Sequence, residues 1–126
     1  MKARAFPGCT SGATALEFAL TAPLFFALIL GIGTVGIGLY TNVALQHAVE
    51  RAARCASVNA TTCGSNSAIQ SYAVSQSYGL NPPVSTFTVS TPACGKQVNA
   101  NYPVKFNFGY FGTPTFTLKA ASCFPA

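Results

Sequence analysis

The chain has 126 residues, of which half are hydrophobic and only 7% are charged, and its formal net charge is +5. A composition this apolar excludes an ordinary soluble domain and indicates a membrane segment joined to one small domain. The seven basic residues are scattered along the chain and form no compact stripe, so no nucleic-acid partner is expected.

Residues 1–12 have the features of a processed leader. Lys2 and Arg4 supply positive charge, a Pro-Gly pair breaks any early helix, and the segment ends in Gly12. Removing these residues would take two basic residues from the chain and leave the remainder mildly basic. We therefore expect the mature protein to begin after this segment.

Glu17 stands alone at the start of a long apolar run. A carboxylate costs about 2.5–3.5 kcal/mol at the centre of a membrane helix and less near the interface, so its presence needs a reason. One interpretation is an interfacial acid that the helix N-terminus stabilises by up to about 1 kcal/mol. The other is an acid that pairs with a positive charge on a neighbouring subunit, which offsets the cost of moving it into an apolar environment.

The run from Phe18 to Tyr40 contains no charged residue. At about 1.5 Å per residue it is long enough to cross a hydrocarbon core of about 30 Å, and we expect a transmembrane helix over residues 13–42. The basic residues before it place the N-terminus in the cytoplasm. Residues 43–126 then form an exported head, which begins with an extension of the same helix over residues 43–56.

Small residues occupy one ridge of the predicted membrane helix: Gly31, Thr34 and Gly38. Such a surface lets helices approach closely, but each glycine also weakens a helix by up to about 1 kcal/mol relative to alanine. The ridge is therefore either a helix-packing face or a segment that loosens as the helix leaves the membrane. Pro23 removes one helical hydrogen bond and should bend the helix in its first turns.

The helix extension is amphipathic. We expect its apolar side to comprise Val43, Leu45, Ala48, Val49, Ala52 and Ala53. Glu50 and Arg54 have the spacing and order of a helical ion pair on the solvated side. His47 is interpreted as a polar residue near the membrane interface.

The second half of the chain changes from helical to strand periodicity. After a loop over residues 59–65, the spacing of apolar residues predicts a short second helix over residues 66–78. Pro103 cannot donate a backbone hydrogen bond, so it should lie at a strand edge or a bulge. Beyond Pro83 we expect an α+β head with an antiparallel meander of about three strands, over residues 84–90, 97–108 and 116–123.

Five cysteines are present: Cys9 in the leader, and Cys55, Cys63, Cys94 and Cys123 after the membrane segment. Four cysteines in an exported domain predict two disulfides with three possible pairings, of which we favour Cys55–Cys63 with Cys94–Cys123. Each is worth about 2–4 kcal/mol, which matters in so small a core. No metal site is expected, because there is no CxxC pair and His47 is the single histidine.

Catalysis is not expected either. The chain contains no Asp, and its two Glu residues lie at the start of the apolar run and on the helix extension. A Ser-His-acid or Cys-His arrangement would depend on His47 alone. The glycines of residues 31–38 follow no strand, so they are not a phosphate-binding loop, and no cofactor is predicted.

Residues 11–30, SGATALEFALTAPLFFALIL, look very like the start of TadE-family proteins, the pseudopilins of tight-adherence (Flp-type) type IV pili. Residues 42–55, NVALQHAVERAARC, and the closing SCFP of residues 122–125 are also similar to family members. In type IV prepilins a short basic leader ends in Gly, cleavage follows it, and Glu is the fifth mature residue. Those positions are Gly12 and Glu17 here.

The resemblance implies cleavage after Gly12 by a prepilin peptidase, with Ala13 as the new N-terminus and Glu17, beside Phe18, as the assembly residue. Major Flp pilins commonly carry Tyr at the place of Phe18 and are much shorter, so a minor, pseudopilin-type role in building or priming an adhesive pilus is implied. The implied partners are the inner membrane, the peptidase, other pilins and pseudopilins, and the pilus assembly platform. The head would be periplasmic, and the subunit either stays in the inner membrane or joins the extracellular pilus.

Two other functions stay open. A signal-anchored periplasmic binding module would keep its N-terminal segment and never polymerise. A secreted protein would lose the helix as a signal peptide, but Glu17 is an unusual start for such a segment, and no convincing small-x-small cleavage site follows Tyr40.

Overall fold

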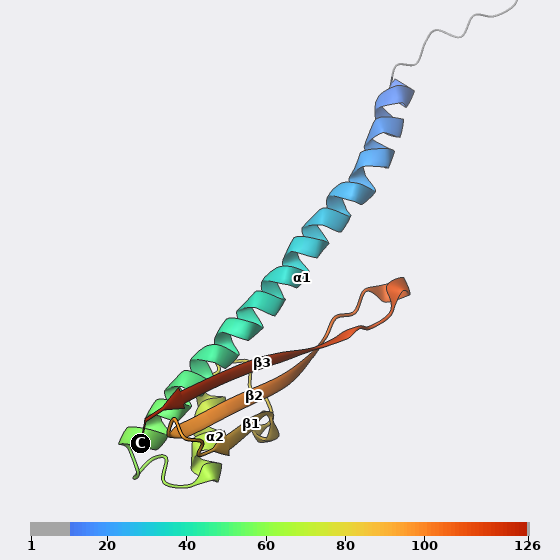
Figure 1. The fold of residues 1–126 in the computed structure, drawn as a ribbon. Helices are drawn as coiled ribbons and strands as arrows, with labels where there is room; N and C mark the ends of the chain where they lie inside the picture. Colours follow the sequence, from blue (N-terminus) through green and yellow to red (C-terminus); the bar gives the residue numbers. More distant parts are fainter. Residues whose placement is uncertain (1–10, 126) are drawn as a thin grey trace, which may run out of the picture. The chain divides into compact units, whose positions relative to one another are not determined.

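The computed structural model describes residues 11–125, without the side chains of Ser11 and Phe111. Two short 3₁₀ segments, η1 (Val84–Thr86) and η2 (Gly109–Phe111), interrupt the connections of the second half. The other elements, shown in Figure 1, are α1 (Ser11–Val58), α2 (Asn66–Ser75), β1 (Phe87–Ser90), β2 (Lys96–Lys105) and β3 (Thr115–Phe124). The α+β class predicted from the sequence is confirmed. Most of the predicted leader, with Cys9, lies outside the described residues.

The chain divides into two compact units between Gly36 and Ile37, within α1. In the first unit, residues 12–36 are helical, and all their side chains are exposed except those of Ala22 and Thr34, which are half-buried. Within the described part of the chain, α1 is long and apolar enough to cross a membrane, with a mean hydropathy of 2.1 in its most apolar window. An apolar surface of this extent is favoured in lipid rather than in water.

The second unit folds around one hydrophobic core, to which α1, α2 and all three strands contribute. Its buried members are Leu45, Ala48, Val49, Ala52, Ala53, Cys55, Cys63, Ile69, Ala73, Phe87, Val98, Ala100 and Ala120. The helix extension therefore supplies the apolar face that the sheet needs. The expectation for Val43 was wrong: it is 64% exposed, while its neighbour Ala44 is buried. One residue along an α-helix turns the side chain by about 100°, which carries Val43 away from the core.

The sheet has the order β1-β2-β3 with antiparallel pairing between neighbours. Phe87, Ala100 and Ala120 lie opposite one another across the three strands, and all are buried. Because paired residues point to the same side of a sheet, this row marks the face that packs on the helices. On the other face of β2, Asn101 and Lys105 are exposed, so the predicted half-buried strand is confirmed.

Pro103 lies where β2 has a partner on one side only. It is paired with Thr117 of β3. The pairing of β2 with β1 stops at Ala100, which lies opposite Phe87, the first residue of β1. The N–H of Phe106 donates to the carbonyl of Pro114 in the same register, at 3.1 Å. Hydrogen-bonded pairs alternate along an antiparallel ladder, so the nitrogen of Pro103 faces away from β3, toward the open edge. The predicted edge position is confirmed.

Three predicted boundaries were too wide. The second helix ends at Ser75, because Tyr78 and Gly79 adopt positive φ values of 50° and 81°. The first strand begins at Phe87, because residues 84–86 form η1. The second strand ends at Lys105 rather than at residue 108, where the hairpin turn begins to form.

The loop between α1 and α2 explains two features of the sequence. Ser65 Oγ accepts a hydrogen bond from the N–H of Ala68 at 3.2 Å, so Ser65 is the N-cap of α2. A Cβ at Gly64 would collide with the carbonyl oxygen of Ala60. Glycine at this position therefore permits the close turn that follows Cys63.

Two disulfides stabilise the second unit. Cys55–Cys63 joins the end of α1 to the following loop, and Cys94–Cys123 joins the β1–β2 loop to β3. These are the two pairs favoured from the sequence. The first pair is buried in the core, whereas Cys94 is exposed.

Removal of Cys94–Cys123 should destabilise the head more than removal of Cys55–Cys63. The two disulfides close loops of 29 and 8 residues, for which chain entropy gives about 3.6 and about 2.5 kcal/mol. Urea unfolding of the full-length protein in detergent micelles, followed by near-UV circular dichroism, measures both losses. The variants are Cys94→Ala/Cys123→Ala and Cys55→Ala/Cys63→Ala. A larger loss for the shorter loop would mean that burial of its cysteines outweighs loop entropy.

Candidate functional site

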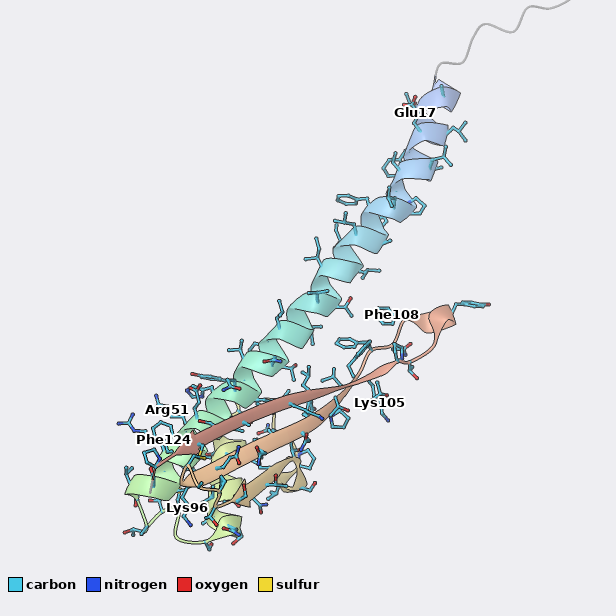
Figure 2. All side chains as sticks on the ribbon, viewed as in Figure 1. Glu17, Arg51, Lys96, Lys105, Phe108 and Phe124 are labelled. Atoms are coloured by element: carbon cyan, nitrogen blue, oxygen red, sulfur yellow. A yellow bond between two sulfur atoms is a disulfide. The ribbon has the colours of Figure 1, made fainter. Side chains whose placement is uncertain are left out.

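The residues predicted for processing and assembly lie in the first turns of α1. Gly12, Ala13, Glu17 and Phe18 are helical and exposed, and Figure 2 shows Glu17 near the start of the helix. Positions 13 and 17 are one turn apart and share a helix face. An ammonium group on residue 13 would therefore lie within reach of a carboxylate on residue 17.

Threonines within the apolar run, and Thr41 directly after it, bond their hydroxyl groups within the helix. Thr21 Oγ1 donates to the carbonyl oxygen of Glu17 at 2.9 Å. Thr34 and Thr41 likewise donate to the carbonyl oxygens four residues earlier. Because an unpaired hydroxyl is costly in an apolar medium, these bonds let polar side chains remain in a membrane or between packed helices.

A shallow apolar depression follows Glu17 on the helix surface. It is lined by Phe18, Thr21, Ala22, Phe25 and Phe26. Pro23 lies within the same stretch of α1, where it cannot donate the usual helical hydrogen bond. The depression is a surface on which an apolar side chain of a neighbouring helix can pack.

The small-residue ridge is open along part of its length. A Cβ added at Gly31 would meet no atom within 4 Å, whereas one at Gly38 would lie 3.4 Å from Cζ of Phe106. The head itself therefore contacts the ridge at Gly38. Helix packing at Gly31, Thr34 and Gly38 stays a prediction, and Gly31 is the member with free space for a partner.

His47 is tied to the segment after α2. Its Nδ1 lies 3.2 Å from the carbonyl oxygen of Gln76 and must carry the hydrogen, since a carbonyl oxygen only accepts. Its Nε2 accepts from the hydroxyl of Tyr78 at 3.2 Å and from Nε of Arg51 at 3.4 Å. Tyr40 adds a hydrogen bond of 2.6 Å to the carbonyl of Tyr78. The group fixes a loop to α1, a role that the sequence did not reveal.

A group of aromatic residues at the β2–β3 turn was not predicted from the sequence. Phe108, Tyr110 and Phe116 are exposed near the turn between β2 and β3, and the half-buried ring of Phe106 lies beside those of Phe108 and Phe116. The signal was present in the segment FNFGYFGTPTF, where aromatic residues outnumber the polar ones expected at a turn. Phe106 and Phe108 alternate with polar residues, and this pattern was interpreted as the continuation of a half-buried strand.

Comparison with known proteins bears on the helical part of the chain. Residues 12–54 match the family model described as TadE-like protein. The match covers the candidate processing and assembly residues, the apolar run and most of the helix extension, about one third of the chain. No curated protein and no solved structure matches the chain. The resemblance to the TadE-like family is thus confirmed for this segment.

Proposed function

We propose that this chain is a minor pseudopilin that helps to build or prime a tight-adherence (Flp-type) type IV pilus. The observation that carries the proposal is the order of Gly12, Glu17 and the apolar run inside the segment that matches the TadE-like family. The exposed, apolar first unit and the disulfide-bonded head agree with a membrane-anchored subunit whose head is exported.

The proposed topology has three parts. Residues 1–12 form a leader that a prepilin peptidase removes, residues 13–42 span the inner membrane, and residues 43–126 form the periplasmic head. The subunit stays in the membrane until its apolar helix packs against those of other pilins at the assembly platform. Apart from hydrolysis of the Gly12–Ala13 bond by the peptidase, this mechanism includes no chemical reaction and no cofactor.

Cleavage creates a positively charged group that can pair with the carboxylate of Glu17. The new ammonium group of Ala13 lies one helical turn from the carboxylate, so the two charges can pair within one subunit in the membrane. During assembly the carboxylate exchanges this partner for the ammonium of the neighbouring subunit. Pairing lowers the cost of placing both charges among apolar helices.

The proposal predicts that the protein isolated from its native membrane starts at Ala13, as measured by intact mass and N-terminal sequencing. Gly12→Leu should block cleavage, because a large side chain replaces the smallest residue at the cleavage site. Gly8→Leu is the matched control, and it should be cleaved as the wild type is.

The other outcomes identify the alternatives. An intact N-terminus at Met1 in the wild-type protein would overturn the proposal and favour a signal-anchored periplasmic binding module. A start beyond residue 40 would overturn it in favour of a secreted protein.

A further inference from the structure

The hairpin between β2 and β3 ends in a cluster of aromatic side chains, here called the aromatic tip: Phe106, Phe108, Tyr110 and Phe116. Tyr110 is fully exposed, and Phe108 and Phe116 are 46% and 55% exposed. The ring centroid of Phe106 lies 6.3 Å from that of Phe108 and 5.8 Å from that of Phe116. Figure 2 shows Phe108 toward the end of the hairpin, with Lys105 nearer the sheet.

The backbone of the aromatic tip is well defined by hydrogen bonds. The N–H of Phe106 donates to the carbonyl of Pro114, and the N–H of Phe108 donates to the carbonyl of Gly112, both at 3.1 Å. Gly112 has a φ of 87°, which glycine adopts without strain. The hairpin pairing therefore continues beyond β2 and holds the exposed rings in place. An exposed apolar cluster of this kind marks an interaction surface.

The aromatic tip lies at the level where α1 leaves its apolar run. Phe106 contacts Gly38, two residues before the end of that run at Tyr40. Within the second unit, β2 runs from the core toward this contact, and the chain after Phe106 continues beyond it into the turn that carries Tyr110.

The charge of the head suits an anionic lipid surface. After Glu50 the sequence contains no Asp or Glu, while its basic residues are Arg51, Arg54, Lys96, Lys105 and Lys119. Lys105 is exposed directly before the aromatic tip. Basic residues near a membrane are attracted to anionic headgroups, and Glu50 is the single acidic side chain among residues 43–126 that opposes this attraction.

We propose that the aromatic tip inserts into the membrane interface beside the point where α1 leaves the bilayer. This inference rests on the membrane anchoring that the proposed function includes. Aromatic side chains favour the interface between hydrocarbon and headgroups, and the tip projects such side chains toward it with Lys105 behind them. The head then contacts the membrane at α1 and at the tip, and the subunit must release the tip to enter a filament.

The chain contains no Trp, so single Trp variants of the full-length protein report on membrane depth. Each variant is reconstituted in nanodiscs of phosphatidylethanolamine and phosphatidylglycerol, with one protein molecule per nanodisc. The acyl chains of these lipids are either brominated or unmodified. Tyr110→Trp probes the aromatic tip. Phe25→Trp probes the apolar run, and Val58→Trp is an exposed control at the far end of α1.

Brominated acyl chains should quench most of the fluorescence of Tyr110→Trp and Phe25→Trp, and little of that of Val58→Trp. Quenching of Phe25→Trp alone would overturn tip insertion while leaving the membrane anchor intact, and would point to a protein partner for the tip. Lack of quenching in Phe25→Trp would overturn the membrane anchor and, with it, this inference. Either result is independent of where the leader is cleaved.

Discussion

Replacing Glu17 with alanine should leave cleavage after Gly12 intact and abolish pilus assembly. In the proposed assembly this carboxylate pairs with the new ammonium group of the neighbouring subunit, so the variant would leave that ammonium group without a partner among packed apolar helices. Loss of one member of a buried charge pair costs about 3–5 kcal/mol. Intact mass measures cleavage, and the amount of pilin sheared from cells measures assembly.

The control for this variant is Leu20→Ala, which shortens an exposed apolar side chain close to Glu17 and leaves all charges in place. It should assemble far better than Glu17→Ala. Glu17→Gln keeps the size of the side chain and removes its charge, so it should fail as the alanine variant does. Normal piliation of Glu17→Ala would contradict the pairing role.

Replacing Phe87 with alanine should destabilise the head by about 3–5 kcal/mol, as expected for a buried phenylalanine. Phe87 is fully buried and is the largest of the fully buried side chains among the described residues. Its ring lies in the row with Ala100 and Ala120, whose small side chains leave room for it. Its carbonyl also accepts a hydrogen bond of 2.7 Å from Nε2 of Gln70, which joins α2 to β1.

Urea unfolding of the full-length protein in detergent measures this loss, with near-UV circular dichroism as the signal. Tyr110→Ala removes an aromatic ring of similar size from a fully exposed position, and surface substitutions of this kind change stability by less than about 0.5 kcal/mol. Equal losses in the two variants would show that Phe87 does not anchor the core. Because whole domains are stable by only about 5–15 kcal/mol, the Phe87 variant should also accumulate poorly in cells.

Periodicity made much of this fold predictable. The uncharged run from Phe18 to Tyr40 and the amphipathic pattern after it define one long helix, and alternation in β2 defines a half-buried strand. Ser65 caps α2 with its side-chain hydroxyl, and Pro103 lies at a strand edge because its nitrogen carries no hydrogen. Cysteine parity pointed to two disulfides, and both are present.

What could not be predicted depends on contacts between distant parts of the chain. Val43 is as apolar as its neighbours, and only the position of the sheet decides that Ala44 is buried instead. Thr41 is buried because its hydroxyl bonds to the carbonyl of Ile37, which its polarity alone would not suggest. Two partners of His47, Gln76 and Tyr78, come from a loop about thirty residues further along the chain.

At the start of α1 the sequence was informative about chemistry and silent about partners. The order of Gly12, Ala13, Glu17 and Phe18 predicts that they act together in processing and assembly. Packing partners for Gly31 and Thr34 require a second subunit, which one chain cannot supply. The aromatic tip was not predicted, because an alternating strand pattern does not show which of its apolar residues are buried in a core and which stay exposed.

Pro103 has a consequence for the assembly that we propose. Beyond Ala100, β2 has no neighbour on one side, and such an open strand edge can recruit a strand from another molecule. Pro103 presents no donor there, and exposed Asn101 and Lys105 flank it. The missing donor makes that edge a poor template for strand addition. In the proposed assembly, neighbouring heads can therefore approach one another without joining their sheets at this edge.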